Sequence, residues 1–96
     1  MKVEHMVWFK WNEGVTPAQI EQHLSGLRSL TEKVPGIIAL KCGLNFTDRA
    51  RGFTHGLSVT LESLEGLKIY ADHPEHMAVA TKIRSDAEVM AMDFEF

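Results

Sequence analysis

The sequence predicts an α+β domain in which helices cover one face of a four-stranded antiparallel sheet. Three observations carry this prediction. Segments with strand-like and helix-like hydrophobic patterns follow the order strand, helix, strand, strand, helix, strand. Glycine, proline or short polar stretches separate these segments. The chain has 96 residues, which is enough for one hydrophobic core, so residues 1–96 are expected to form a single domain.

The first strand is expected over residues 3–11, and its apolar side chains lie on both faces. One face carries Val3, His5, Val7, Phe9 and Trp11, and the other carries Met6 and Trp8. This pattern is typical of a strand that is covered on both sides. A turn at residues 12–14 ends the strand.

The first helix is expected to begin after Thr16. Threonine is a favourable N-cap, Pro17 suits the first helical turn, and Gln19 completes a capping box. Apolar residues then recur at helical spacing as far as residue 34. Pro35 and Gly36 follow directly and predict the end of the helix.

Two strands are expected next, over residues 37–46 and 53–61, with a polar connection at 47–52 between them. The second of these strands alternates cleanly between apolar and small or polar residues. Its apolar face carries Phe53, His55, Leu57, Val59 and Leu61. The pattern therefore places His55 on the face that is expected to be covered by helices.

A second helical region is expected after Ser63, which can serve as its N-cap. Leu64, Leu67 and Tyr70 follow at helical spacing, and Pro74 is expected to open a new helical segment that continues to about residue 83. The last strand is expected over residues 89–96.

This order of elements is that of the split βαβ, or ferredoxin-like, arrangement, βαββαβ. Its sheet has one face under helices and one bare face. The bare face is expected to carry Met6, Trp8, Met90, Met92, Phe94 and Phe96. An exposed apolar patch of this kind usually marks an interface, so we expect a homodimer in which two sheets pack face to face into an α/β barrel.

Composition excludes several classes of partner. The chain carries 10 Lys and Arg against 13 Asp and Glu, which argues against nucleic-acid binding. No apolar run approaches the roughly 18 residues needed to cross a bilayer, so no membrane contact is expected. The single cysteine, Cys42, cannot form an internal disulfide, and together these features favour a reducing, cytoplasmic compartment.

Four polar side chains are expected to meet in one apolar space between the sheet and the helices. His5 and His55 lie on the apolar faces of two strands that should both be central, and Tyr70 and His76 flank the break in the second helical region. Burying such groups together costs stability unless they bond to one another or to a ligand. We therefore expect a small-molecule pocket, which Leu24 and Leu27 would line from the first helix.

The residue types suggest proton transfer at a carbonyl compound. A neutral imidazole, with a reference pKa of about 6.5, can take and return a proton, and a phenol can donate to a developing oxyanion. The alternative for each residue alone is a structural role, a histidine or tyrosine packed in the core with one hydrogen bond. No metal site is predicted, because the carboxylate or thiolate ligands at short spacing that such sites use are missing. His73 is expected to cap the new helical segment, and His23 to lie on the surface of the first helix.

The sequence resembles the stress-responsive A/B barrel domain (Dabb) family of dimeric α+β barrels. The resemblance spans the whole chain. It rests on the segments 5–10, 34–37, 43–45, 52–57, 70–76 and 93–94, of which Tyr-Ala-Asp-His-Pro-Glu-His at 70–76 is the most specific. It implies a ferredoxin-like monomer that pairs through its bare sheet face.

The family includes a plant polyketide cyclase that closes an aromatic ring by aldol condensation. By resemblance, His76 would be the general base, Tyr70 the oxyanion donor, and His5 and His55 further pocket residues. Three hypotheses follow. The first is a stress-related protein with a small-molecule pocket and no assigned activity. The alternative is a lyase or cyclase that acts on a small carbonyl compound. The third, a haem or oxygen-chemistry enzyme, is disfavoured by four clustered polar groups, and no cofactor is expected.

Overall fold

A computed structural model of residues 1–96 shows three helices packed on a four-stranded antiparallel sheet. The elements are β1 (Val3–Trp11), α1 (Pro17–Lys33), β2 (Ile37–Leu44), β3 (His55–Leu61), α2 (Leu64–Asp72), α3 (Pro74–Asp86) and β4 (Ala87–Glu95). The strand order is β2-β3-β1-β4, and all three pairings are antiparallel. The predicted ferredoxin-like fold is confirmed, and β1 and β3 are its central strands.

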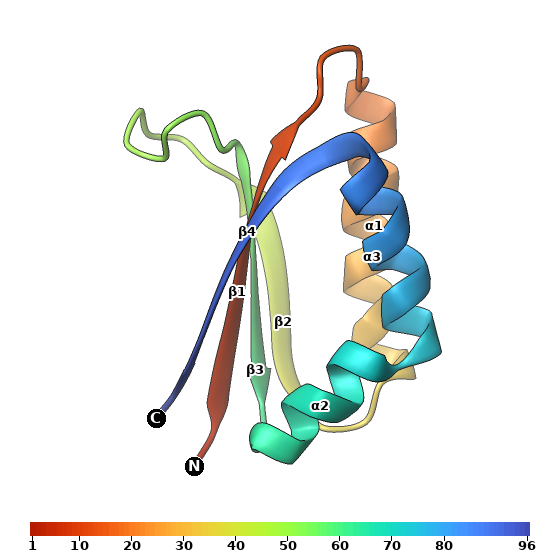
Figure 1. Ribbon diagram of the computed structural model, residues 1–96, viewed down its shortest axis with the longest axis vertical. Helices are drawn as coiled ribbons and strands as arrows, with labels where there is room; N and C mark the ends of the chain where they lie inside the picture. The colour runs from red at the N-terminus through yellow and green to blue at the C-terminus, as the bar shows by residue number, and fades with distance from the viewer.

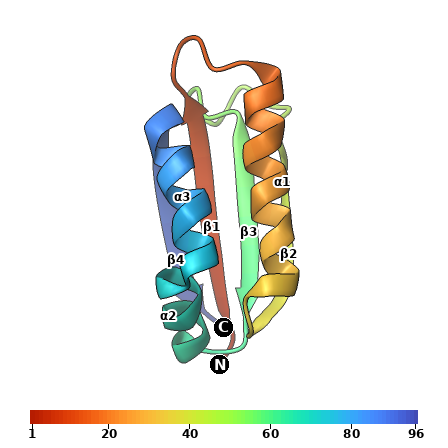
Figure 2. The ribbon, with the colours of Figure 1, turned by 90° about the vertical axis from the view of Figure 1, so that its right-hand side faces the viewer.

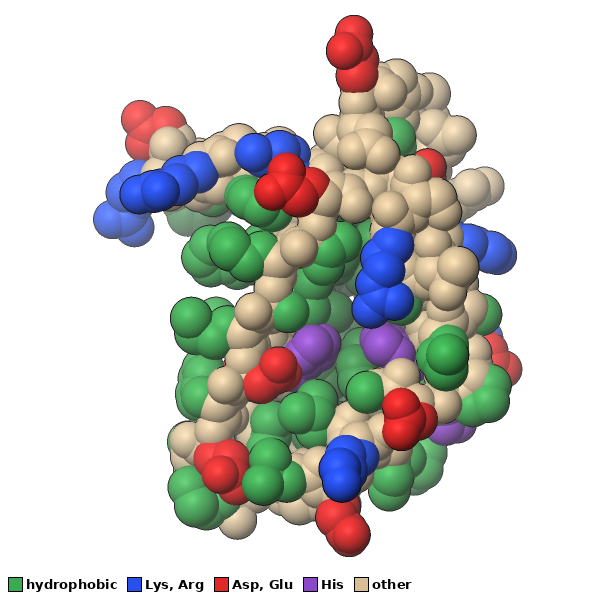
Figure 3. All heavy atoms as spheres, in the orientation of Figure 1, with side chains coloured by type: hydrophobic (Ala, Val, Ile, Leu, Met, Phe, Trp, Pro, Cys, Tyr) green, Lys and Arg blue, Asp and Glu red, His purple; other side chains and the backbone are tan.

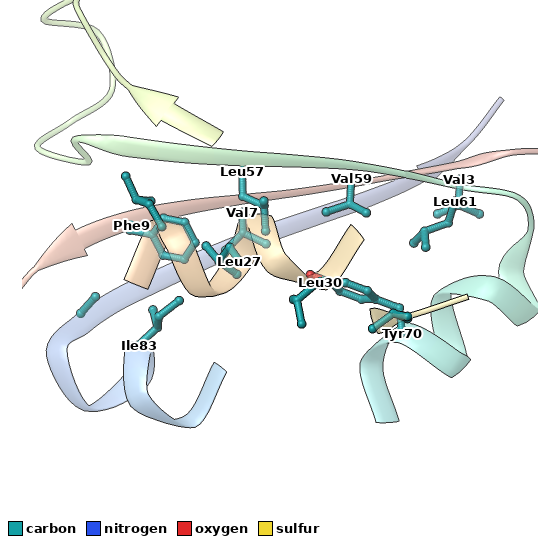
Figure 4. Close-up of a cluster of buried hydrophobic side chains, with 13 residues drawn as sticks. Val3, Val7, Phe9, Leu27, Leu30, Leu57, Val59, Leu61, Tyr70 and Ile83 are labelled. Atoms are coloured by element: carbon teal, nitrogen blue, oxygen red, sulfur yellow. The ribbon is translucent and has the colours of Figure 1, made fainter. Parts of the chain in front are cut away.

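All helices lie on one side of the sheet. Figures 1 and 2 show α1 and α3 side by side over this face, with α2 at one end, while the other face is bare. The hydrophobic core fills the space between the sheet and the helices, as Figure 4 shows. The core includes Val3, Val7, Phe9, Leu27, Leu30, Leu57, Val59, Leu61, Tyr70 and Ile83.

Local sequence signals explain where the helices begin. The side chain of Thr16 accepts a hydrogen bond from the Gln19 amide at 3.2 Å, and the Gln19 side chain accepts one from the Thr16 amide at 2.8 Å. This is the predicted capping box. Ser63 caps α2 by accepting a hydrogen bond from the Gly66 amide, and His73 caps α3 by accepting one from the Glu75 amide. Pro74 is the first residue of α3, so the second helical region consists of two separate helices.

Three strand boundaries differ from the prediction by two residues. β2 ends at Leu44 because Asn45 turns the chain, with its side-chain amide donating to the Thr47 carbonyl oxygen at 2.8 Å. β3 begins at His55, since the amide of Phe53 bonds within the preceding turn. β4 begins two residues early, at Ala87, where it pairs with the end of β1. The β2–β3 connection projects on the bare side of the sheet (Figure 1).

The bare sheet face carries large apolar side chains, as predicted. Those that are exposed are Trp8, Met90, Met92, Phe94 and Phe96. They belong to β1 and β4 or follow β4 directly. Toward β3 the same face is polar, because the carboxylate of Glu4 accepts hydrogen bonds from the hydroxyls of Ser58 and Thr60. The exposed apolar area is therefore concentrated on one half of the sheet.

Candidate functional site

A cavity of about 180 Å³ lies between the sheet and the helices, and most of its lining is apolar. Its polar lining consists of His5 on β1, Tyr70 on α2, and His76 and Arg84 on α3. Figure 3 shows histidine side chains in a hollow between the sheet edge and the helices, with acidic and basic side chains beside them. A concave apolar space with a few convergent polar groups is the usual form of a small-molecule site.

Tyr70 is the most deeply buried polar side chain of this site. Only 1% of the residue is exposed, and its hydroxyl has no hydrogen-bond partner. Figure 4 shows its ring reaching from α2 into the space under the sheet, with the hydroxyl at the inner end. Burial raises the pKa of Tyr70 above its ordinary value, so the hydroxyl stays protonated. An unpaired donor of this kind is available to an oxygen atom of a bound molecule.

The ring of Tyr70 packs against two imidazoles. Its centroid is 5.5 Å from that of His5 and 4.3 Å from that of His76. The two histidines come from different elements, β1 and α3, and the tyrosine comes from α2. The fold therefore brings together three groups that are far apart in the sequence.

His76 is held in the first turn of α3 by the backbone of α2. Its Nδ1 lies 3.1 Å from the carbonyl oxygen of Ala71. A carbonyl can only accept, so Nδ1 carries the hydrogen and Nε2 keeps a free lone pair. Burial lowers the pKa of His76, and the positive charge of Arg84 acts in the same direction. The ring is therefore neutral at pH 7 and can act as a base.

His5 is oriented by Asp93. The two residues lie directly opposite each other in the β1–β4 pairing, and His5 Nδ1 donates a hydrogen bond to the Asp93 carboxylate. This bond fixes the orientation of the His5 ring in the cavity wall. Sequence reasoning did not assign Asp93 to the site. The available signal was the antiparallel pairing of the two terminal strands, which places these residues opposite each other only in one register.

His55 does not line the cavity, so the expected meeting of four polar side chains is corrected to three. His5 pairs with Val59 and His55 with Phe9, which separates the two histidines by four positions, or about 13 Å, along the sheet. Nδ1 of His55 accepts a hydrogen bond from Trp11 Nε1 at 2.9 Å, and burial lowers the pKa of His55. His55 thus provides a hydrogen-bond acceptor for the partly buried indole N–H of Trp11.

Of the two leucines expected to line the pocket, only one does so. Leu27 lines the cavity, whereas Leu24 is buried in the core beyond it. His23, expected on the helix surface, is partly buried instead. Its ring stacks on Trp11 with centroids 5.4 Å apart, and its Nε2 lies 2.7 Å from an Asp86 carboxylate oxygen.

No group of three or more His, Cys, Asp or Glu side chains is arranged to hold a metal ion. None of the three helices has the length and hydrophobicity that a membrane span requires.

The fold and the bare apolar sheet face define a class of ferredoxin-like α+β proteins. One solved structure of this class, a dimeric ferredoxin-like protein from Thermobifida fusca, has a TM-score of 0.88 and 28% identity, covering 100% of this chain and 92% of that one. A hydroxynitrile lyase from Passiflora edulis has a TM-score of 0.90 at 21% identity, covering 97% of this chain and 91% of the lyase. The second likeness concerns the fold alone.

The family model of the stress responsive A/B barrel domain, Dabb, matches residues 3–96, and the chain belongs to this family. The resemblance found in the sequence is thus confirmed. A curated relative, olivetolic acid cyclase of Cannabis sativa, is 30% identical over 87 residues, which cover 88% of this chain and 86% of the cyclase.

Proposed function

We propose that the cavity binds a small carbonyl compound and that the protein catalyses proton transfer next to its carbonyl group, as in a lyase or cyclase. One observation carries the proposal: the buried hydroxyl of Tyr70 has no partner, and the ring of Tyr70 contacts two imidazoles. The cyclase relative supports the same type of chemistry, since aldol ring closure begins with loss of such a proton.

Each group has a defined role in the proposed step. The substrate carbonyl oxygen accepts a hydrogen bond from the Tyr70 hydroxyl. Nε2 of His76 takes a proton from the adjacent carbon, and the electron pair of that C–H bond moves toward the carbonyl oxygen. The enolate formed is stabilised by the Tyr70 hydroxyl, which burial keeps protonated. The enolate carbon can then attack a second carbonyl or regain its proton from His76.

His5 is the second base candidate in this proposal. Its hydrogen bond to Asp93 uses Nδ1 and leaves Nε2 as the ring nitrogen available to a ligand. This arrangement suits the return of a proton to the product or to an aldol oxygen. The pair is therefore proposed to act in the later half of the reaction.

The size of the cavity favours a small substrate. A volume of about 180 Å³ is close to that of a cavity of roughly 150 Å³ that holds benzene in another protein. We therefore propose a substrate comparable to one substituted ring. The bare sheet face and the dimeric structural neighbours support a homodimer as the working form.

Hydrogen exchange at a ketone tests the proposal without knowledge of the natural substrate. Acetophenone in D₂O exchanges its methyl hydrogens slowly, and the protein is expected to accelerate this exchange. His76→Ala should lower the catalysed rate by about 10²–10⁴-fold. His73→Asn is the matched control, because His73 caps α3 outside the cavity and asparagine is also a good N-cap.

Two results would contradict the proposal. Exchange that is no faster with the protein than without it, while acetophenone binds, would make the cavity a binding site without this catalysis. An undiminished rate in His76→Ala would remove His76 from the reaction.

A further inference from the structure

Arg84 is the only lysine, arginine, aspartate or glutamate that lines the cavity. It lies on α3, it is exposed, and no carboxylate forms an ion pair with it. Its side chain also makes no hydrogen bond within the protein. The guanidinium of Arg84 thus lies beside a mostly apolar cavity and has no partner within the protein.

The position of Arg84 on α3 relates it to the reacting groups. His76, Ala80, Ile83 and Arg84 all line the cavity, and their spacing of four, seven and eight residues places them on one face of the helix. Eight residues correspond to about 12 Å along a helix axis, and helical side chains lean toward the N-terminus, which here is the end that carries His76. The small side chain of Ala80 leaves the space between them open.

We propose that the natural ligand is a small keto acid, with its ketone at Tyr70 and its carboxylate on the guanidinium of Arg84. The ketone end rests on the proposed function, whereas the carboxylate end rests on Arg84 alone. A planar guanidinium matches a carboxylate with two parallel hydrogen bonds. A phosphate dianion fits less well, because one arginine would have to balance two charges beside an apolar wall.

The charge on the ligand can be tested with two compounds that differ only in their terminal group. Benzoylpropionate and benzoylpropionamide share a ring, a ketone and the length of the chain, and only the first is an anion. Titration of each into the protein, followed by amide chemical shifts of the cavity residues, gives both dissociation constants. The wild-type protein is expected to bind the acid about tenfold more tightly than the amide.

Variants of α3 separate the role of Arg84 from the general charge of the helix. Arg84→Gln should weaken binding of the acid about tenfold and leave binding of the amide within about twofold. Lys82→Gln removes the same charge from an exposed position of α3 that does not line the cavity, and it should change neither constant. Arg84→Lys should give an intermediate dissociation constant for the acid, because lysine keeps the positive charge but cannot form the two parallel hydrogen bonds of a guanidinium.

The outcomes distinguish this inference from the proposed function. Equal binding of acid and amide, or equal losses in Arg84→Gln and Lys82→Gln, would overturn the role of Arg84 and leave the acetophenone result untouched. Binding of the acid alone through Arg84, without accelerated exchange of acetophenone, would retain the carboxylate site and reject the catalytic proposal. Failure of both compounds to bind would reject the cavity as a site for either.

Discussion

The hydroxyl of Tyr70 is the residue-scale feature on which the proposed function depends. A buried hydroxyl without a partner lowers stability, and a structural tyrosine at this position would be expected to have one. Its retention in the core is explained if a bound molecule supplies the missing acceptor. Structural and catalytic roles for Tyr70 therefore predict opposite effects of removing this single oxygen atom.

Tyr70→Phe is expected to leave the free energy of unfolding unchanged or to raise it by about 1 kcal/mol, because it removes an unsatisfied buried donor. The same variant should lose most of its catalysed exchange of acetophenone, since the enolate loses its hydrogen bond. Urea denaturation and NMR exchange rates give the two quantities. A loss of stability above about 1 kcal/mol would indicate that the hydroxyl is bonded within the protein.

The pKa of His76 predicts how stability depends on pH. Burial lowers this pKa in the folded protein, so the unfolded chain binds a proton more readily. The contribution of His76 to stability is therefore complete above the unfolded value of about 6.5 and is lost as the pH falls through the lower folded pKa.

Urea denaturation at about pH 7.5 and pH 5.5 measures this contribution, because the two values bracket the ordinary pKa of histidine. The wild-type protein is expected to lose more stability between them than His76→Gln, which cannot titrate. The matched variant is His55→Gln. It should also lose less stability between the two pH values than the wild type, since burial lowers the pKa of His55 as well. A larger loss of stability in His76→Gln than in the wild type would show that folding raises the pKa of His76 instead of lowering it.

At the scale of elements, the capping box of α1 is expected to contribute measurably to stability. Thr16→Ala removes the acceptor for the Gln19 amide and should cost about 1 kcal/mol. Thr16→Ser retains the hydroxyl and is the matched control, with an expected loss well below that of alanine. The free energy of unfolding from urea denaturation gives the comparison. Equal losses in both variants would show that the methyl group of Thr16, rather than its hydroxyl, stabilises this end of the helix.

The elements also show which features could be predicted from the sequence. The capping box, the cap at His73 and the proline at the start of α3 are local signals, and each predicts its own boundary. The partners of His5 and His55 are set by strand register, which depends on pairing between distant segments. The alternation of side chains along each strand placed both histidines on the covered face. It could not show that they lie four residue positions apart along the paired strands. For the same reason it did not bring Asp93 into the site.

At the scale of the molecule, the two faces of the sheet carry different features. Its covered face provides the cavity and the groups around Tyr70, and its bare face carries the exposed apolar side chains of β1 and β4. The β2–β3 connection projects on the bare side (Figure 1). Face-to-face pairing of two chains would bury this patch without closing the cavity behind the sheet.

Met92 lies within this patch, opposite Met6 in the β1–β4 pairing, and 62% of it is exposed in the single chain. Met92→Glu should therefore place a charge in the interface and shift the protein from dimer to monomer, because a buried unpaired carboxylate is costly. Met77 is a matched control: it is 53% exposed but lies on α3, so Met77→Glu should remain dimeric. Sedimentation equilibrium at micromolar concentration measures the mass of all three proteins. A monomeric wild-type protein, or a Met92→Glu variant that remains dimeric, would show that the bare sheet face is not the interface.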